Sequence, residues 1–438
     1  MKQSPKFKAA MKKYILGGIA VSLFLALDGA SAENRAFGLV PAAQFRARGG
    51  IGNVLAKLNA GKDVRIAYFG GSITAANGWR PKTLKWFQQT WPNAKVSEIN
   101  AAIGGTGSDL GVYRNAQDVL QHKPDLVFVE FAVNDSDASP ENIWRGMEGI
   151  VRQTWKANPE TDIAFVYTFM RGQENDLKDG NFPRSTSAME RLADYYHIPS
   201  ISVAFKINQL LQGGKLWIVP EKDENGKDRP TPEGLLLFST DGVHPLDAAH
   251  QVYADVVSDA IKAMKSEAKP GAHELKAPMQ ADNWEDAKIV PPKQDMLSAG
   301  WKKLDATSPF RGFFERMPEM WEATTPGEKI SFRFKGTAVK LYDLLGPDGA
   351  KVNVTLDNKT RVAQRFDKYC SYHRLATLSI GDGLPDTEHT VSVEILPEQP
   401  DRSSVVDQEK QMPGFNPKKY DGTGMRVGGV MIIGKLLP

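Results

Sequence analysis

The feature that most restricts the fold of this chain is an alternation of short apolar runs with amphipathic stretches between about residues 61 and 265. The five apolar runs span residues 64–69, 96–103, 125–133, 162–169 and 198–204. Runs of this length are typical of strands that are covered on both faces. The stretches between them are helix-like, and Pro140 is well placed for the first turn of one helix. The alternation predicts a parallel sheet with helices on both of its faces.

The sequence changes character after residue 265. Residues 266–295 are rich in Pro, Ala and charged residues, which predicts a linker. Residues 296–438 contain short runs of period two, separated by turn sequences such as GPDG and GDGLPD. This pattern predicts an antiparallel β-sandwich that is jelly-roll-like. Residues 215–238 interrupt the earlier alternation, so we expect an inserted excursion that could cover the site as a lid.

The N-terminus has the three parts of a secretory signal. A lysine-rich start precedes the apolar run YILGGIAVSLFLAL, and Ala30-Ser31-Ala32 supplies a small-residue cleavage pattern. We therefore expect residues 1–32 to be a signal peptide and the mature protein to be exported, to the periplasm or the exterior. The apolar run is short for a membrane span, so we expect no span after cleavage.

Charge and cysteine content exclude several classes of function. Without residues 1–32 the formal net charge falls from +3 to about −1, so no basic bias suggests a nucleic-acid partner. Cys370 is the only cysteine, which excludes an internal disulfide and the cysteine-rich zinc sites. We expect neither a metal nor a cofactor.

Residues suited to acyl transfer follow the predicted strands. Ser72 comes directly after the first strand, Gly105 follows the second, and Asn134 follows the third, while Asp241 and His244 precede the last helix. Because ligands of such sheets bind beyond the carboxyl ends of the strands, these residues are expected to share one edge.

Each of these residue types has a part in that chemistry. A serine hydroxyl becomes a useful nucleophile when an imidazole takes its proton, and a carboxylate orients the imidazole. We therefore predict Ser72, His244 and Asp241 as a catalytic triad. The backbone N–H groups of Ser72 and Gly105 and the side chain of Asn134 are the predicted donors to the oxyanion. Two further acids, Glu130 and Asp135, are expected to be structural hydrogen-bond acceptors at the end of a strand.

The ordered set of serine, glycine, asparagine and histidine resembles the SGNH (GDSL-type) hydrolase family, with Asp241 in DGVHP completing the triad. The resemblance covers roughly residues 61–265 and implies a flavodoxin-like, three-layer α/β/α domain with five parallel strands, which we place at residues 33–265. Two positions depart from the family pattern. Gly71 stands where an Asp usually precedes the serine, and Ala132 stands where a glycine is common.

The resemblance and the second domain together suggest a carbohydrate substrate. Several carbohydrate esterases similar to this chain combine an SGNH domain with a jelly roll. Trp79, Arg80 and Lys82 follow the nucleophile, and Arg171 follows the fourth strand. An exposed aromatic ring could stack on a sugar and the cations could bind an anionic glycan. The favoured alternative is that Trp79 begins a core helix and the cations form its solvated face. The sandwich either binds glycan or supports the edge that carries the site.

The expected function is a secreted serine esterase that removes O-acetyl groups from a carbohydrate or polysaccharide. Three alternatives remain open at the level of sequence. The protein could be a lipolytic or aryl esterase of the same fold, a glycan-binding protein without hydrolytic activity, or an O-acetyltransferase that uses the same residues.

Overall fold

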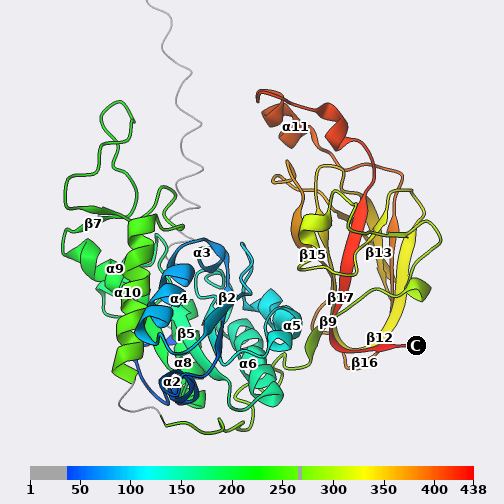
Figure 1. Ribbon diagram of the computed structural model, residues 1–438. Helices are drawn as coiled ribbons and strands as arrows, with labels where there is room; N and C mark the ends of the chain where they lie inside the picture. The colour runs from blue at the N-terminus through cyan, green and yellow to red at the C-terminus, as the bar shows by residue number, and fades with distance from the viewer. Residues whose placement is uncertain (1–36, 265–268) are drawn as a thin grey trace, which may run out of the picture.

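The computed structural model describes residues 37–264 and 269–438, so the predicted signal peptide lies outside the described residues. An α/β domain and a β domain stand side by side in this structure (Figure 1). This arrangement confirms the expected fold class. Among the described residues, no helix is long and apolar enough to cross a membrane.

The α/β domain is built on a six-stranded sheet of order β1-β6-β5-β4-β2-β3. Strands β2 to β6 run parallel, while β1 pairs with β6 in the antiparallel sense. In chain order, the bounds of β1 to β6 are Phe45–Arg46, Val64–Gly70, Val96–Asn100, Leu126–Glu130, Asp162–Tyr167 and Ser200–Ser202. The chain reverses its direction of winding between β2 and β4, which is where doubly wound sheets bind their ligands.

The sequence predicted the five parallel strands, but they are not all buried to the same extent. Strands β4, β5 and β6 are buried throughout, because helices cover both faces of the sheet. Strand β3 lies at the edge and is partly exposed, so the expectation that it is buried on both faces was wrong.

Two sets of helices cover the sheet. Helices α4 and α9 both pack against α10, and α5 and α8 both pack against α6. The bounds of α2 to α10 are Gly52–Asn59, Ser72–Ala75, Trp79–Thr90, Ser108–Asp118, Pro140–Ala157, Glu174–Lys178, Arg184–Tyr196, Val203–Gln212 and Asp247–Met264. Pro140 occupies the first turn of α6 behind the capping residue Ser139, as the sequence predicts. Helix α5 lies on the side of the sheet that faces the β domain (Figure 1).

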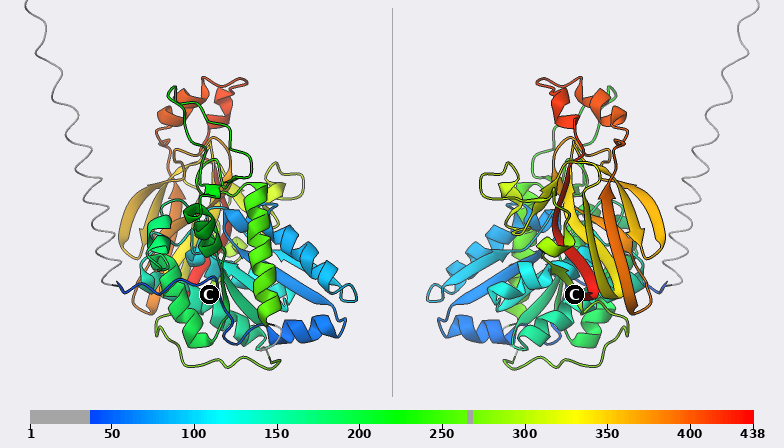
Figure 2. Two further views of the ribbon diagram at one scale, coloured as in Figure 1. Left: turned by 90° about the vertical axis from the view of Figure 1, so that its left-hand side faces the viewer. Right: turned by 90° about the vertical axis from the view of Figure 1, so that its right-hand side faces the viewer.

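The predicted excursion forms a small two-stranded sheet, β7 (Leu216–Trp217) and β8 (Leu236–Leu237). The loop between these strands is polar and largely exposed. It carries the ion pairs Lys222–Asp228 and Arg229–Glu221. The excursion and helix α11 (Ser403–Glu409) project at the same end of the molecule (Figure 2).

The predicted linker is bound along the α/β domain. His273 Nε2 lies 2.8 Å from the buried Asp162 carboxylate, and the backbone N–H groups of Met279 and Gln280 donate to Glu148. Farther on, β9 (Ala287–Val290) pairs with β17 (Met425–Leu437) of the β domain. The segment is therefore fixed by buried acceptors at several points, which a Pro-rich composition does not indicate.

The β domain consists of antiparallel strands in one continuous nine-stranded sheet. The bounds of β10 to β17 are Lys302–Lys303, Trp321–Ala323, Lys329–Leu345, Lys351–Leu356, Lys359–Gln364, Arg374–Gly381, Thr387–Ile395 and Met425–Leu437. The long strand β12 pairs with β16 along its first half and with β15 along its second half. Single turns of 3₁₀ helix occur at Leu120–His122, Gln294–Met296, Arg311–Phe313 and Pro417–Tyr420.

Strand β12 changes partners next to Gly336. Its backbone is held against β17 so closely that a Cβ on Gly336 would lie 2.0 Å from the carbonyl oxygen of Ile433. Only glycine permits this approach. Strand β12 therefore continues through Gly336, with a shift in its register against β17 at this point.

Candidate active site

The sharp turn that carries Ser72 explains the pair of glycines before it. Strand β2 ends at Gly70, and Ser72 is the first residue of α3. A Cβ on Gly70 would lie 2.6 Å from the carbonyl oxygen of Glu130, and one on Gly71 would lie 1.9 Å from Oδ1 of Asn134. Both glycines are required because the turn packs directly against the end of β4. The Asn134 amide occupies the space that a side chain at position 71 would need.

The structure brings the three predicted triad residues into one chain of hydrogen bonds. His244 Nε2 lies 2.8 Å from Ser72 Oγ, and His244 Nδ1 lies 2.7 Å from Asp241 Oδ2. The serine is half-buried, whereas the side chains of His244 and Asp241 are 53% and 52% exposed. These distances are short enough for proton transfer between neighbouring groups without rearrangement.

The Asp241 carboxylate is fixed by its own loop. Its Oδ1 accepts hydrogen bonds from the backbone N–H groups of Val243 and His244 and from the hydroxyl of Ser239, at 2.8–2.9 Å. Desolvation raises the pKa of Asp241, but the hydrogen bonds from His244, Val243 and Ser239 outweigh it and hold the pKa well below its ordinary value. Asp241 is therefore ionised at neutral pH and can hold His244 in one orientation. Sequence reasoning missed Ser239, which orients Asp241 from two residues upstream.

The predicted oxyanion donors lie around the same serine. The Ser72 N–H belongs to the first turn of a helix, where backbone N–H groups have no acceptor within the helix. The loop of Gly104 and Gly105 rests against the serine, because a Cβ on Gly104 would lie 3.5 Å from Ser72 Cβ. Gly105 has a φ of +73°, which favours glycine. Asn134 lies against Gly71, the residue before the serine.

Two buried carboxyl groups tie these loops together. Glu130 accepts hydrogen bonds from the hydroxyls of Thr74 and Thr168, and Asp135 accepts one from the backbone N–H of Ser108 at the start of α5. Burial raises the pKa of each acid to about 7, although these hydrogen bonds act in the opposite direction. Both acids are structural acceptors, as the sequence predicts.

Two of the predicted substrate-binding residues lie in the core. Trp79 is fully buried, and its ring packs edge-on against Tyr68. Arg80 is 7% exposed and forms an ion pair with Glu98 at 2.5 Å. The helix that follows the nucleophile turns these side chains inward, so the expectation that they contact a sugar was wrong.

The two other predicted cations differ in position. Lys82 forms an ion pair with Asp247 at 2.9 Å on the surface shared by α4 and α10. Arg171 is exposed beside the catalytic loop, where its backbone N–H donates to the carbonyl of Gly242 at 2.7 Å. Its Cβ and Cδ lie 3.0 and 3.3 Å from the place of a Cβ on Gly242. Of the two, Arg171 is the one next to the triad.

A cavity of about 750 Å³ lies between the two domains, on the Gly105 side of the site. The loop from Ile103 to Gly107 forms one wall, and residues 372–377 with Tyr369 of the β domain form another. Tyr369 and Tyr372 are 57% and 60% exposed. Sequence reasoning missed this surface, and its one local indication was the two tyrosines in KYCSYHR.

Comparisons with known proteins agree with this geometry. Residues 68–252 match the GDSL-like lipase/acylhydrolase family. A search of curated protein sequences finds no significant match.

Two crystal structures of a two-domain esterase (CEX), described as active on acetylated mannans, are similar over most of this chain. One has a TM-score of 0.67 at 21% identity and covers 89% of this chain and 96% of that chain. The other, co-crystallised with mannopentaose, has a TM-score of 0.65 at 21% identity and covers 86% and 92%. At this identity the likeness concerns the two-domain fold. The order of the strands and the serine–histidine–aspartate arrangement agree with the family match: residues 68–252 of this chain are similar to the GDSL-like lipase/acylhydrolase family.

Proposed function

We propose that this protein is an exported serine esterase that removes O-acetyl groups from a carbohydrate. The observation that carries the proposal is the unbroken chain of hydrogen bonds from Ser72 through His244 to Asp241. The predicted signal peptide at residues 1–32 supports the assignment to the periplasm or the exterior.

The reaction follows from the positions of these groups. Ser72 Oγ attacks the acetyl carbonyl carbon while His244 Nε2 takes its proton, and the N–H groups of Ser72 and Gly105 with the Asn134 amide stabilise the oxyanion. His244 then protonates the leaving sugar oxygen as the C–O bond breaks. Water attacks acetyl-Ser72 in the same way, with His244 again taking the proton, and acetate leaves as Ser72 Oγ is reprotonated.

Three observations support a sugar ester as the substrate. The cavity beside Gly105 presents Tyr369 and Tyr372, whose rings offer apolar faces and whose hydroxyls offer hydrogen bonds, as a sugar requires. The loop between β7 and β8 in the excursion is polar and therefore unlike an apolar lid that would bind a lipid surface. The fold is also shared with an esterase described as active on acetylated mannans.

Release of acetate from acetylated polysaccharides tests this proposal. We expect wild-type protein to release acetate from one or more of them and Ser72→Ala to release none. The paired substitution Tyr369→Ala/Tyr372→Ala should raise KM for the active glycan and leave the hydrolysis of p-nitrophenyl acetate unchanged. Val362→Ala, which alters an exposed side chain on β14, is the matched control.

Three results would contradict parts of the proposal. Equal KM values for the glycan in the tyrosine and control variants would exclude the cavity as the sugar site. A preference for long-chain p-nitrophenyl esters would favour a lipolytic enzyme. Transfer of the acetyl group to an added glycan in place of release as acetate would favour an acetyltransferase.

A further inference from the structure

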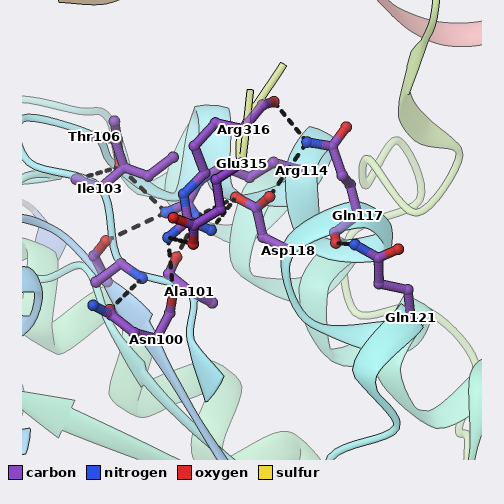
Figure 3. A network of polar contacts seen from close by, with 12 residues as sticks. Asn100, Ala101, Ile103, Thr106, Arg114, Gln117, Asp118, Gln121, Glu315 and Arg316 are labelled. Carbon is purple, nitrogen blue, oxygen red and sulfur yellow. Dashed lines mark hydrogen bonds and ion pairs between the residues drawn. The ribbon is translucent and has the colours of Figure 1, made fainter. Parts of the chain in front are cut away.

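A buried arginine on α5 holds the loops on which the nucleophile and an oxyanion donor stand. Arg114 is completely buried, and its guanidinium lies over the ring of Phe69, 4.5 Å from the centroid. It donates to the carbonyls of Gly70 and Ala101 and to the hydroxyl of Thr106 (Figure 3). Gly70 lies two residues before Ser72, and Thr106 directly follows Gly105. Arg114 therefore connects the loop that carries Ser72 with the loop that carries Gly105.

The charge of Arg114 is balanced by a carboxylate that a second arginine shares. Asp118 Oδ2 lies 2.9 Å from Nη1 of Arg114 and 3.7 Å from Nη1 of Arg316, which comes from the segment between β10 and β11 of the β domain. Asp118 is 3% exposed, so solvent screens these interactions weakly. Arg114 and Arg316 therefore share the Asp118 carboxylate, and each of them helps to fix its position for the other.

Arg316 also contacts the α/β domain directly. Its Nη2 donates to the carbonyl of Asn100, the last residue of β3, at 2.7 Å, and its own carbonyl accepts from the Gln117 amide at 2.7 Å (Figure 3). Asn100 is four residues before Gly104. Arg316 thus bridges the β domain to the end of the strand that leads into the oxyanion loop.

Apolar side chains pack around this network, at the junction between the α/β domain and the β domain. Met317, next to Arg316, is fully buried in a hydrophobic cluster that also contains Phe69 of β2 and Tyr342 of β12. The side chain of Met317 packs so close to the backbone of Gly428 that a Cβ there would lie 2.5 Å from it. The junction is therefore part of a core that runs through both domains.

We infer that the β domain sets the position of the oxyanion loop through Arg316, which makes Arg316 a positioning residue for hydrolysis at Ser72. The inference rests on the proposed function. Without the guanidinium, the Asn100 carbonyl loses its donor, and Asp118 keeps Arg114 as its remaining arginine partner. Arg114 can then shift, and it carries the hydrogen bonds to both loops. The β domain would accordingly affect the rate of hydrolysis of every ester, including esters too small to contact the β domain itself.

Hydrolysis of p-nitrophenyl acetate by the full chain tests the inference. Arg316→Met keeps most of the side-chain volume and removes the donors. We expect it to lower kcat about 10- to 100-fold, as misplacement of an oxyanion donor by a fraction of an ångström would do, with KM within about twofold of wild type. Arg316→Lys keeps the charge and should recover part of the loss. Arg333→Met, which breaks the exposed ion pair with Glu388 on the same domain, should leave both constants unchanged.

A second measurement separates this inference from the proposed function. A fluorophosphonate probe phosphonylates an activated serine: the Ser72 Oγ–P bond forms, fluoride leaves, and His244 takes the hydroxyl proton, while negative charge develops in the oxyanion hole. We expect Arg316→Met to be labelled about 10-fold more slowly than wild type and Arg333→Met at the wild-type rate, at a temperature where thermal unfolding shows all variants folded.

Each outcome decides a different point. Labelling at Ser72 with equal rates and equal kcat in wild type and Arg316→Met would overturn the inference and leave the serine esterase in place. An Arg316→Met variant with a lower melting temperature and an unchanged kcat would overturn it as well, since Arg316 would then be structural alone. No labelling of Ser72 in the wild type would overturn the proposed function and the inference together.

Discussion

Replacement of Gly71 by alanine is expected to inactivate this protein without straining its backbone. Gly71 has a φ of −92°, which alanine adopts freely. The new Cβ, however, would lie 1.9 Å from Oδ1 and 2.9 Å from Cγ of Asn134. The methyl group therefore competes with the Asn134 amide for the same space.

The size of the effect follows from how far the amide has to move. An ordinary contact needs about 3.4 Å, so the Asn134 side chain must retreat by roughly 1.5 Å. A hydrogen-bond donor displaced by that distance no longer reaches the oxyanion. Loss of one such donor lowers kcat about 10²- to 10³-fold, or about 3–4 kcal/mol of transition-state stabilisation. We expect a loss of this order for Gly71→Ala, with a smaller effect on KM.

A double-mutant cycle gives this prediction its control. Hydrolysis of p-nitrophenyl acetate would be measured for Gly71→Ala, Asn134→Ala and the double variant. Because Asn134→Ala removes the group with which the methyl collides, Gly71→Ala should cost little in that background. Gly271→Ala is the matched control, since a Cβ at Gly271 meets no atom within 4 Å and should leave kcat unchanged.

Additive losses in the cycle would refute this reasoning. They would show that alanine at position 71 acts on Ser72 or on the turn itself and not through Asn134. A wild-type kcat for Gly71→Ala would refute it more strongly, because the amide of Asn134 would then have no fixed place against the turn.

Three further predictions concern the triad and the buried acids. Asp241→Asn should lower kcat for p-nitrophenyl acetate about 10²-fold, since a neutral amide holds the His244 imidazolium less well and solvent screens this half-exposed pair; an unchanged kcat would exclude Asp241 from the triad. Trp79→Ala should lower the free energy of unfolding by about 3–5 kcal/mol in urea titrations, and a raised KM for glycan with unchanged stability would restore its role in binding. Burial raises the pKa of Asp135 to about 7, so the folded protein holds this proton more tightly than the unfolded chain does. The free energy of unfolding should therefore fall as pH rises from about 4 to about 7, and Asp135→Asn should reduce this slope; an unchanged slope would contradict the shift.

Local sequence patterns predicted the five parallel strands of the α/β sheet, but not the short antiparallel strand β1, and they predicted the three residues that the structure joins by hydrogen bonds. The apolar runs marked all five parallel strands. Strands β4, β5 and β6 are apolar because both of their faces are covered, whereas the edge strand β3 also contains exposed polar residues. The triad was predictable because each of its residues follows a strand or precedes a helix at the same edge of the sheet. The orientation of Trp79 and Arg80 was not predictable in this way. They begin a helix, and the face of the helix that meets the sheet depends on the geometry of the preceding turn.

Contacts between distant segments were also beyond local patterns. Residues 269–290 look like a free linker, but they bind along the α/β domain through acceptors such as Glu148 and Asp162, more than 100 residues away in the sequence. The close approach of Gly336 to β17 depends on a strand about 100 residues away, and the bridge through Arg316 depends on the placement of the second domain. A local pattern carries no information on which surfaces of two domains meet.

The most direct test of the central claim is the detection of acetyl-Ser72. Full-length mature protein would be mixed with p-nitrophenyl acetate, quenched in acid within the first turnovers, digested and analysed by mass spectrometry. We predict one acetyl group on the peptide that contains Ser72, and none on that peptide in Ser72→Ala, which should also show no turnover. Steady hydrolysis without acetylation of Ser72, or hydrolysis by Ser72→Ala at the wild-type rate, would contradict the assignment of Ser72 as the nucleophile.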